Sequence, residues 1–222
     1  MRIAKRSAWV VLTLSVVVGC WMLCQTAGSS AAPDVPAATL PATSAAATTI
    51  SPSTSPALKP QRLRGVDNFA KVSAFLYRGA QPTAEGFAQI RKLGVRTVVN
   101  LRSVHSDRDE LKGLGLRYVH IACQAWHPED EDVVRFLKVL SDPANHPVFV
   151  HCQEGADRTG CMVAAWRMFH DAWGLEAAVE ELRTFGFHPI WSDITAYLRK
   201  FNAEAMRQKL AATPAPKIDT VE

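Results

Sequence analysis

The strongest constraint on this chain is a ten-residue loop sequence that joins an apolar strand to an apolar helix. Residues 146–150 have the composition of a short buried strand, and residues 161–168 have that of an apolar helix. Between them, residues 151–160 read His-Cys-Gln-Glu-Gly-Ala-Asp-Arg-Thr-Gly, which places Cys152 six positions before Arg158. In such a turn, backbone N–H groups and the helix dipole converge on one point. The sequence therefore predicts an anion-binding loop with a cysteine at its base.

The residues of this loop also indicate its chemistry. The cradle favours the thiolate of Cys152, which makes its sulfur a candidate nucleophile. Arg158 offers a planar fork of donors that matches two oxygens of a phosphoryl group. Thr159 offers a hydroxyl that can bond the sulfur or stabilise it as a leaving group. We predict that the residues contacting the phosphate are Gln153, Glu154, Gly155, Ala156, Asp157, Arg158 and Thr159.

The opposite interpretation is a buried core cysteine beside a helix-end surface arginine. Each feature alone is common, but the complete string at a strand–helix boundary is rare by chance. The loop sequence therefore favours the catalytic interpretation.

The rest of the domain alternates strand and helix patterns, ending in a helical C-terminal half. Strands are expected at 74–78, 96–101 and 116–121. The expected helices run from Thr83 to Leu93, and over 107–114, 129–142, 175–185 and 191–210. This alternation predicts an α/β fold with a mainly parallel central sheet flanked by helices.

The N-terminal segment, residues 1–27, has the pattern of an export signal or a membrane anchor. A cationic leader (1–6) precedes the uncharged and mostly apolar residues 8–24. This length fits a signal peptide or a short span, and the Val-Val-Gly-Cys that ends at Cys20 also resembles a lipoprotein-processing site. All three interpretations predict a membrane contact for this segment. They place the rest of the chain outside the cytoplasm, as a periplasmic or cell-surface protein that is anchored or secreted.

Composition divides the remaining chain into three parts. Residues 28–60 are rich in Ala, Ser, Thr and Pro and lack aromatic residues, so a disordered linker is expected. The phosphoryl-binding domain is assigned to residues 61–211 and a flexible tail to residues 212–222.

Charge and cysteine usage exclude two classes of function. The net charge is +4, but four basic residues and one acid before position 61 account for three of these charges. A domain with one net positive charge is not expected to bind nucleic acid. The five cysteines include no pair with zinc-ligand spacing, so neither a metal site nor a cofactor is expected.

The loop resembles that of the cysteine-dependent tyrosine and dual-specificity phosphatases, in which His-Cys-x5-Arg-Ser/Thr is the family pattern. The sequences at 76–82 and 98–102 resemble those of bacterial and plant or fungal atypical members, as does Gly-Phe-His at 186–188. The resemblance covers about residues 66–202 and implies a tyrosine-phosphatase-like fold. It also implies that Cys152 attacks phosphorus to give a phosphocysteine, while Arg158 holds the phosphoryl oxygens.

The family also uses an aspartic acid on a mobile loop to protonate the leaving group, and its usual Trp-Pro-Asp is absent here. In an ungapped alignment from Cys152, Asp130 falls where plant and fungal relatives carry an aspartic acid after a proline. Asp130 is therefore the first candidate. Glu129, Asp132 and His127 are the alternatives. Acids after a proline are also a normal helix start, where they stabilise the helix dipole.

Two arginines outside the loop have open roles. Arg78 either positions the phosphate loop or is a structural arginine. Arg102 ends a strand on the ligand-binding edge of the expected sheet, so it either touches substrate or forms a salt bridge with a helix.

The resemblance implies a phosphatase acting on phosphotyrosine in protein or peptide partners, with phosphoserine and phosphothreonine as further candidate substrates. A phosphoinositide or inositol-phosphate phosphatase is the alternative, with a phospholipid head group as the partner. Gln153, Glu154, Ala156 and Asp157 argue against it, because this inner loop holds acids where a polyanion needs cations. A non-catalytic phosphate-binding pseudophosphatase is disfavoured by the intact Cys152 and Arg158.

Overall fold

The computed structural model describes residues 58–222. The expected N-terminal segment (1–27) and the expected linker as far as residue 57 lie outside the described residues. Within residues 58–222, no helix is both long and apolar enough to cross a membrane.

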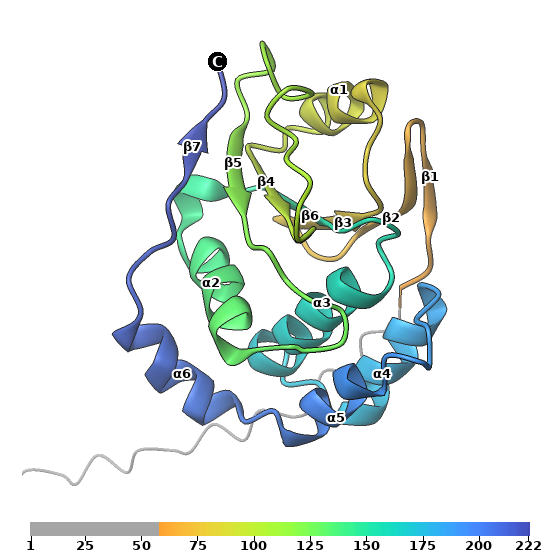
Figure 1. The fold of residues 1–222 in the computed structure, drawn as a ribbon, viewed down its shortest axis with the longest axis vertical. Helices are drawn as coiled ribbons and strands as arrows, with labels where there is room; N and C mark the ends of the chain where they lie inside the picture. Colours follow the sequence, from red (N-terminus) through yellow and green to blue (C-terminus); the bar gives the residue numbers. More distant parts are fainter. Residues whose placement is uncertain (1–57) are drawn as a thin grey trace, which may run out of the picture. The chain divides into compact units, whose positions relative to one another are not determined.

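One seven-stranded sheet forms the centre of the described part of the chain (Figure 1). Its strands are β1 (Gln61–Leu63), β2 (Val66–Lys71), β3 (Leu76–Gly79), β4 (Thr97–Asn100), β5 (Arg117–His120), β6 (Val148–His151) and β7 (Asp219–Thr220). The order across the sheet is β1-β2-β3-β6-β4-β5-β7. The four central strands, β3, β6, β4 and β5, are parallel, while β1, β2 and β7 add antiparallel pairs at the two edges. The expectation of a mainly parallel α/β sheet is confirmed.

Helices cover both faces of the sheet (Figure 1). They are α1 (Ala84–Lys92), α2 (Asp130–Ser141), α3 (Asp157–His170), α4 (Leu175–Thr184), α5 (Ser192–Lys200) and α6 (Ala203–Ala212), with a short 3-10 turn at Pro143–Asn145. Helix α1 lies on one face, and the other five helices gather on the opposite side.

The alternating side chains of the central strands build two cores. Val98 and Phe149 pack with Phe87 of α1, whereas the next residues, Val99 and Val150, belong to the core beneath α2 and α3. All five side chains are fully buried. Burying a side chain of this size stabilises the fold by about 1.5–3 kcal/mol. Near-continuous apolar strands of this kind are typical of a parallel sheet that is covered on both faces.

Local signals set the expected ends of α1. The Thr83 hydroxyl caps the helix by accepting a 3.1 Å hydrogen bond from the Gly86 backbone N–H. Gly94 then takes a positive φ of 86°, which ends the helix at a low conformational cost. The expectation for this helix is confirmed.

The helix expected over residues 107–114 is wrong, because this segment forms turns instead. The side chain of Asp107 is drawn into the protein by hydrogen bonds to Gln81 and His151. Gly113 and Gly115 both take positive φ values, 74° and 60°, which a helix does not allow. Contacts that are distant in sequence have therefore overridden local helix propensity.

The C-terminal residues also differ from expectation. The helix expected over 191–210 is two helices, and Asn202 caps the second by accepting a 2.9 Å hydrogen bond from the Ala205 backbone N–H. The tail expected at residues 212–222 includes β7, which pairs with β5. Val221, only 8% exposed, donates its backbone N–H to the Leu116 carbonyl at 3.1 Å. The pairing and the burial of Val221 explain why this end is held against the sheet.

Candidate active site

The loop that begins with Cys152 lies between β6, at the centre of the sheet, and the first turn of α3. Cys152 directly follows β6 and is 2% exposed. Helix α3 begins at Asp157, so its free N-terminal N–H groups lie at the end of the loop. This strand–loop–helix arrangement is the expected one. It places the cysteine at the carboxyl end of a parallel sheet, where ligands bind in open α/β folds.

Gly155 is the tightest point of this loop. Its φ is +70°, and a Cβ atom added there would lie 2.5 Å from the carbonyl carbon of Gly79 and 2.6 Å from the backbone nitrogen of Ala80. Both are backbone atoms that cannot swing aside. The loop therefore requires glycine at this position for its conformation as well as for space.

Arg78 holds the loop from beneath. Its Nη2 donates a 2.7 Å hydrogen bond to the Gly155 carbonyl, and its guanidinium lies 3.7 Å from the centre of the Phe185 ring. The side chain is 1% exposed, and burial lowers the pKa of Arg78 to about 10. This value still leaves the arginine charged near neutral pH. Of the two roles left open by the sequence, Arg78 has the loop-positioning one.

Two further residues fix the loop backbone. The Gln81 N–H donates to the Gln153 carbonyl at 3.1 Å. The side-chain amide of Asn68 donates to the Glu154 carbonyl at 3.1 Å and to the Phe185 carbonyl at 2.8 Å. The loop is thus held in place before any substrate arrives, which is the preorganisation that electrostatic catalysis requires.

A buried histidine–aspartate pair is formed by Asp107 and His151, the residue that precedes Cys152. His151 Nε2 lies 2.9 Å from Asp107 Oδ2, and His151 Nδ1 lies 3.1 Å from the Cys152 carbonyl oxygen. Both oxygens are acceptors, so the pair is fully satisfied when both ring nitrogens carry hydrogen. His151 thus contacts the loop backbone through its Nδ1.

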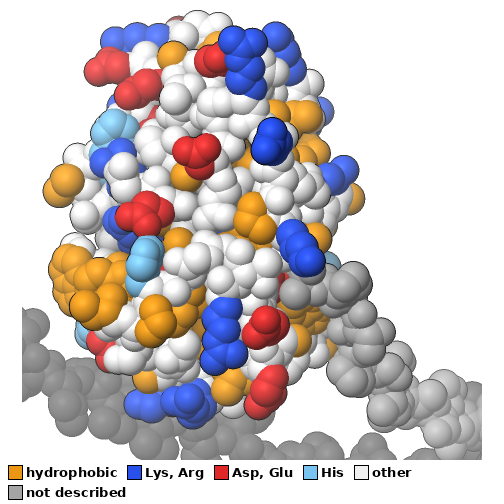
Figure 2. All heavy atoms as spheres, turned by 90° about the vertical axis from the view of Figure 1, so that its right-hand side faces the viewer, with side chains coloured by type: hydrophobic (Ala, Val, Ile, Leu, Met, Phe, Trp, Pro, Cys, Tyr) orange, Lys and Arg blue, Asp and Glu red, His pale blue; other side chains and the backbone are white. Residues whose placement is uncertain are grey.

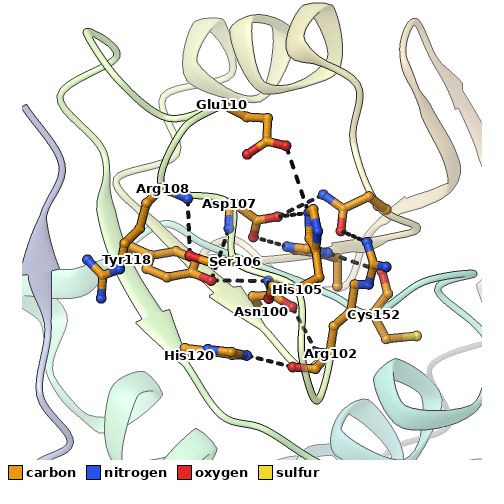
Figure 3. Close-up of polar contacts among 12 residues, drawn as sticks. Asn100, Arg102, His105, Ser106, Asp107, Arg108, Glu110, Tyr118, His120 and Cys152 are labelled. Atoms are coloured by element: carbon orange, nitrogen blue, oxygen red, sulfur yellow. Dashed lines mark hydrogen bonds and ion pairs between the residues drawn. The ribbon is translucent and has the colours of Figure 1, made fainter.

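Asp107 also connects to the second open arginine. Its Oδ1 accepts a 2.8 Å hydrogen bond from Gln81 Nε2, and Gln81 Oε1 accepts a 2.9 Å bond from Arg102 Nη1 (Figure 3). Burial acts to raise the pKa of Asp107, but the hydrogen bonds from His151 and Gln81 bring it below its ordinary value. Asp107 is therefore an ionised anchor. The Arg102 side chain therefore joins this network through Gln81 and not a helix.

Within residues 58–222, one group brings metal-ligating atoms together. Ligand atoms of His105, Asp107 and Glu110 lie within 4.8 Å of one another. Each Asp107 oxygen already accepts a hydrogen bond, from Gln81 or His151. Asp107 is thus engaged in the hydrogen bonds that join it to Gln81 and His151, and the absence of a metal requirement stays a prediction.

A pocket opens above the catalytic loop. Its lining includes four of the residues predicted to contact the phosphate: Gln153, Glu154, Asp157 and Arg158. The other lining residues come from three separate segments: Ser103, Gln124, Ala125, Trp126, His188, Ile190 and Trp191. The sequence predicts no site role for His188, Ile190 or Trp191, because no local pattern links them to a loop about 30 residues earlier.

The remaining predicted loop residues lie below this surface. Cys152 and Ala156 are each 2% exposed. Thr159 is fully buried, and its hydroxyl has no hydrogen-bond partner within the described residues. Its expected bond to the sulfur is therefore not made in this arrangement.

Asp130 lies outside this pocket lining. It is the first residue of α2, where Oδ1 accepts a 2.8 Å hydrogen bond from the Tyr197 hydroxyl and Oδ2 pairs with Lys209. Burial opposes ionisation, but these two hydrogen bonds lower the pKa of Asp130 below its ordinary value. A carboxylate held ionised is poorly suited to donate a proton. Its role as general acid stays a prediction, and these contacts do not favour it.

The alternative acids are also absent from the pocket lining. Glu129 is 3.3 Å from His127. Asp132 is buried on α2, where desolvation raises its pKa despite a hydrogen bond with Cys123. The pocket lining therefore includes Arg158 next to the loop of Cys152, but no carboxylate from residues 122–132.

Comparisons with known proteins agree with this geometry. The family model described as "DSP-PTPase phosphatase fused to NAD+ Kinase" matches residues 61–194. The dual specificity protein phosphatase TpbA of Pseudomonas aeruginosa strain PAO1 is 30% identical over 207 residues, covering 92% of this chain and 86% of TpbA. Inositol diphosphatase DSP5 of Arabidopsis thaliana is 31% identical over 122 residues, covering 51% of this chain and 59% of that protein.

Solved structures extend the comparison. The P. aeruginosa TpbA crystal structure aligns with a TM-score of 0.62 at 29% identity, covering 72% of this chain and 99% of that one. The catalytic domain of the S. cerevisiae PP-IP phosphatase SIW14 aligns with a TM-score of 0.60 at 20% identity, covering 72% and 99%, and shows a shared fold. The fold and site define a cysteine-dependent phosphatase. With these matches, the chain belongs to the dual-specificity phosphatase family.

Proposed function

We propose that this phosphatase hydrolyses phosphotyrosine in proteins or peptides, with phosphoserine and phosphothreonine as secondary substrates. The observation that carries the proposal is an aromatic pair at the pocket mouth. Trp126 and Trp191 both line the pocket beside Arg158, and their ring centroids are 6.1 Å apart. A phosphate cradle next to flat apolar surfaces fits the phosphate and the ring of an aryl phosphate.

The proposed reaction proceeds in two displacements. The Cys152 sulfur attacks phosphorus, and the bond from phosphorus to the substrate oxygen breaks. Water then attacks the phosphocysteine, and the P–S bond breaks to release phosphate and restore the thiolate. Arg158 and the loop N–H groups stabilise the charge on the phosphoryl oxygens in both transition states.

Two apolar side chains at the mouth of the pocket are exposed to solvent. Trp126 is 57% exposed and Ile190 is 78% exposed, and both line the pocket. Figure 2 shows hydrophobic side chains gathered at one edge of the displayed face, beside histidine and acidic side chains. Exposed apolar surface around a binding site indicates contact with a partner. We infer that it contacts the tyrosine ring and the flanking peptide.

Inositol diphosphates are the second candidate substrates, because two Arabidopsis thaliana relatives are named inositol diphosphatases. The charges at the pocket favour the first. Glu154 and Asp157 line it together with Arg158, and a substrate with several phosphates would be repelled by the two carboxylates. TpbA, which matches most of this chain, has been solved in complex with phosphotyrosine.

A substrate panel on the full chain tests this proposal. We expect kcat/KM to be higher for a phosphotyrosine peptide than for the matched phosphoserine peptide or an inositol diphosphate. Trp126→Ala should raise KM for the phosphotyrosine peptide about tenfold, equivalent to about 1.4 kcal/mol of lost ring contact. Its effect on the phosphoserine peptide should be small.

Leu93→Ala is the matched control, because Leu93 is exposed at the end of α1, outside the pocket lining. It should leave both peptides unaffected. A preference for inositol diphosphates in the panel, or equal losses on both peptides in Trp126→Ala, would contradict the phosphotyrosine assignment.

We further propose that the N-terminal segment, residues 1–27, directs the phosphatase domain out of the cytoplasm and contacts the membrane. Support comes from its cationic leader and uncharged apolar run. Fusing residues 1–60 to alkaline phosphatase, which is active only after export, should give active reporter. Inactive reporter in the cytosolic fraction would contradict export.

A further inference from the structure

His188 lies at the pocket but has no role in the two displacements proposed above. It follows α4, and it lines the pocket together with Arg158 and Glu154. About half of its side chain is exposed, at 48%. His188 therefore lies at the mouth of the pocket, beside the loop that carries Cys152.

Asp157 fixes the orientation of the His188 ring. The Asp157 carboxylate accepts the His188 backbone N–H at 2.9 Å through Oδ1 and lies 2.9 Å from His188 Nδ1 through Oδ2. A carboxylate only accepts hydrogen bonds, so Nδ1 carries the hydrogen in this pair. The aspartate–histidine pairing leaves the opposite nitrogen, Nε2, as the working atom of the ring.

Among residues 58–222, no hydrogen bond occupies His188 Nε2. Glu154 Oε2 lies 3.6 Å from this nitrogen, which is too long for a hydrogen bond. Nε2 is therefore available to exchange a proton with a group that enters the pocket.

The charges around His188 favour its protonated form. The hydrogen bond to Asp157 is the largest influence, followed by the charges of Asp157 and Glu154, and together they raise the pKa of His188 above its ordinary value. Arg158 is the cation that shares the pocket lining, and it acts in the opposite direction. A protonated imidazole is a suitable proton donor.

We propose that His188 is the general acid of this phosphatase, positioned by Asp157, and takes the role that a loop aspartate has in the family pattern. The inference rests on the proposed phosphatase function and goes beyond it in naming the proton donor. The pocket lining agrees with this role, since it includes His188. It contains none of the alternative acids Asp130, Glu129 and Asp132.

The proton balance closes over the two displacements. In the first, the Cys152 sulfur bonds to phosphorus while the leaving oxygen departs and takes the proton from His188 Nε2. In the second, water bonds to phosphorus and the P–S bond breaks, while neutral His188 Nε2 accepts the water proton. His188 ends protonated and Cys152 ends as a thiolate, so the enzyme returns to its starting state.

His188→Asn in the full chain tests this role through leaving-group dependence. A phenol like that of tyrosine leaves with a pKa of about 10, so it needs a proton more than the activated leaving group of 4-nitrophenyl phosphate. We expect kcat for phosphotyrosine to fall about 10²-fold, with a much smaller loss on 4-nitrophenyl phosphate. The basic limb of the kcat–pH profile should flatten, since the group whose deprotonation causes it is gone.

His170→Asn is the control, since His170 also pairs with an aspartate, Asp171, at 2.8 Å but does not line the pocket. It should behave as the wild type. Equal losses on both substrates, or an unchanged basic limb, would overturn the assignment. So would finding this leaving-group pattern in Asp130→Asn instead. Failure of the phosphatase function itself would look different, because the wild type would then hydrolyse neither substrate.

Discussion

Replacing Cys152 with serine is expected to abolish turnover, with a loss of about 10⁴-fold or more in kcat. Serine preserves the size of the side chain, but its hydroxyl is not ionised near neutral pH and is a weak nucleophile toward phosphorus. The loop contacts made by Arg78, Gln81 and Asn68 involve the backbone. The variant should therefore still bind a phosphate analogue, which isothermal titration calorimetry with vanadate or a phosphotyrosine peptide can measure.

The control for this variant is Cys161→Ser. Cys161 lies on α3, only nine residues along the chain, and is 3% exposed. Burial raises the pKa of its thiol to about 12, so it remains a neutral thiol near pH 7. Its replacement should leave catalysis largely intact. Substantial hydrolysis by Cys152→Ser, or an equal loss in Cys161→Ser, would remove the assignment of Cys152 as the nucleophile.

Arg158→Lys is expected to give the second largest effect, a loss of about 10²–10³-fold in kcat/KM. Lysine keeps the positive charge but is a point donor, whereas the guanidinium bonds two phosphoryl oxygens at once in a fixed plane. The loss should appear in kcat as well as KM, because the charge on those oxygens is stabilised in the transition state. Steady-state kinetics with phosphotyrosine and 4-nitrophenyl phosphate measure both constants.

Arg207→Lys serves as the matched arginine control. Arg207 lies on α6, half exposed, in an ion pair with Glu204 on the same helix. An exposed pair of this kind contributes little to stability, so the control should have wild-type kinetics. Retention of wild-type kcat/KM in Arg158→Lys would show that the fork is not needed for phosphate recognition.

The parts of the site that the sequence predicted are those encoded within one short stretch. The strand, the loop and the N-terminus of α3 follow one another, so their relative positions are set by local geometry. This is why Cys152 and Arg158 could be assigned together. The strands could be predicted from the sequence as well. β4 and β6 are buried along their whole length and contain adjacent apolar residues, which is typical of a sheet covered on both faces.

The contacts that support the loop were harder to predict from the sequence, since they join segments that are far apart in the chain. His151 meets Asp107 across 44 positions, and His188 meets Asp157 across 31. Neither pairing leaves a periodic pattern in the sequence. The misassigned helix at 107–114 has the same origin, because the hydrogen bonds of Asp107 fall outside any window that measures helix propensity.

Asp130 illustrates how position in a sequence differs from position in a site. An ungapped alignment brought it to the place of a catalytic acid, but in the structure its carboxylate contacts Tyr197 and Lys209 instead. Lys209 lies 79 residues away in the chain. The number of residues before the catalytic strand could not reveal that partner.

Trapping the covalent intermediate tests the central claim most directly. Wild-type protein mixed with phosphotyrosine peptide and quenched in acid within milliseconds should carry one phosphoryl group, and mass spectrometry of its peptides should place that group on Cys152. The same treatment of Cys152→Ser should leave no labelled peptide. Phosphoryl on another residue, or rapid turnover with no phosphocysteine at any quench time, would contradict the account.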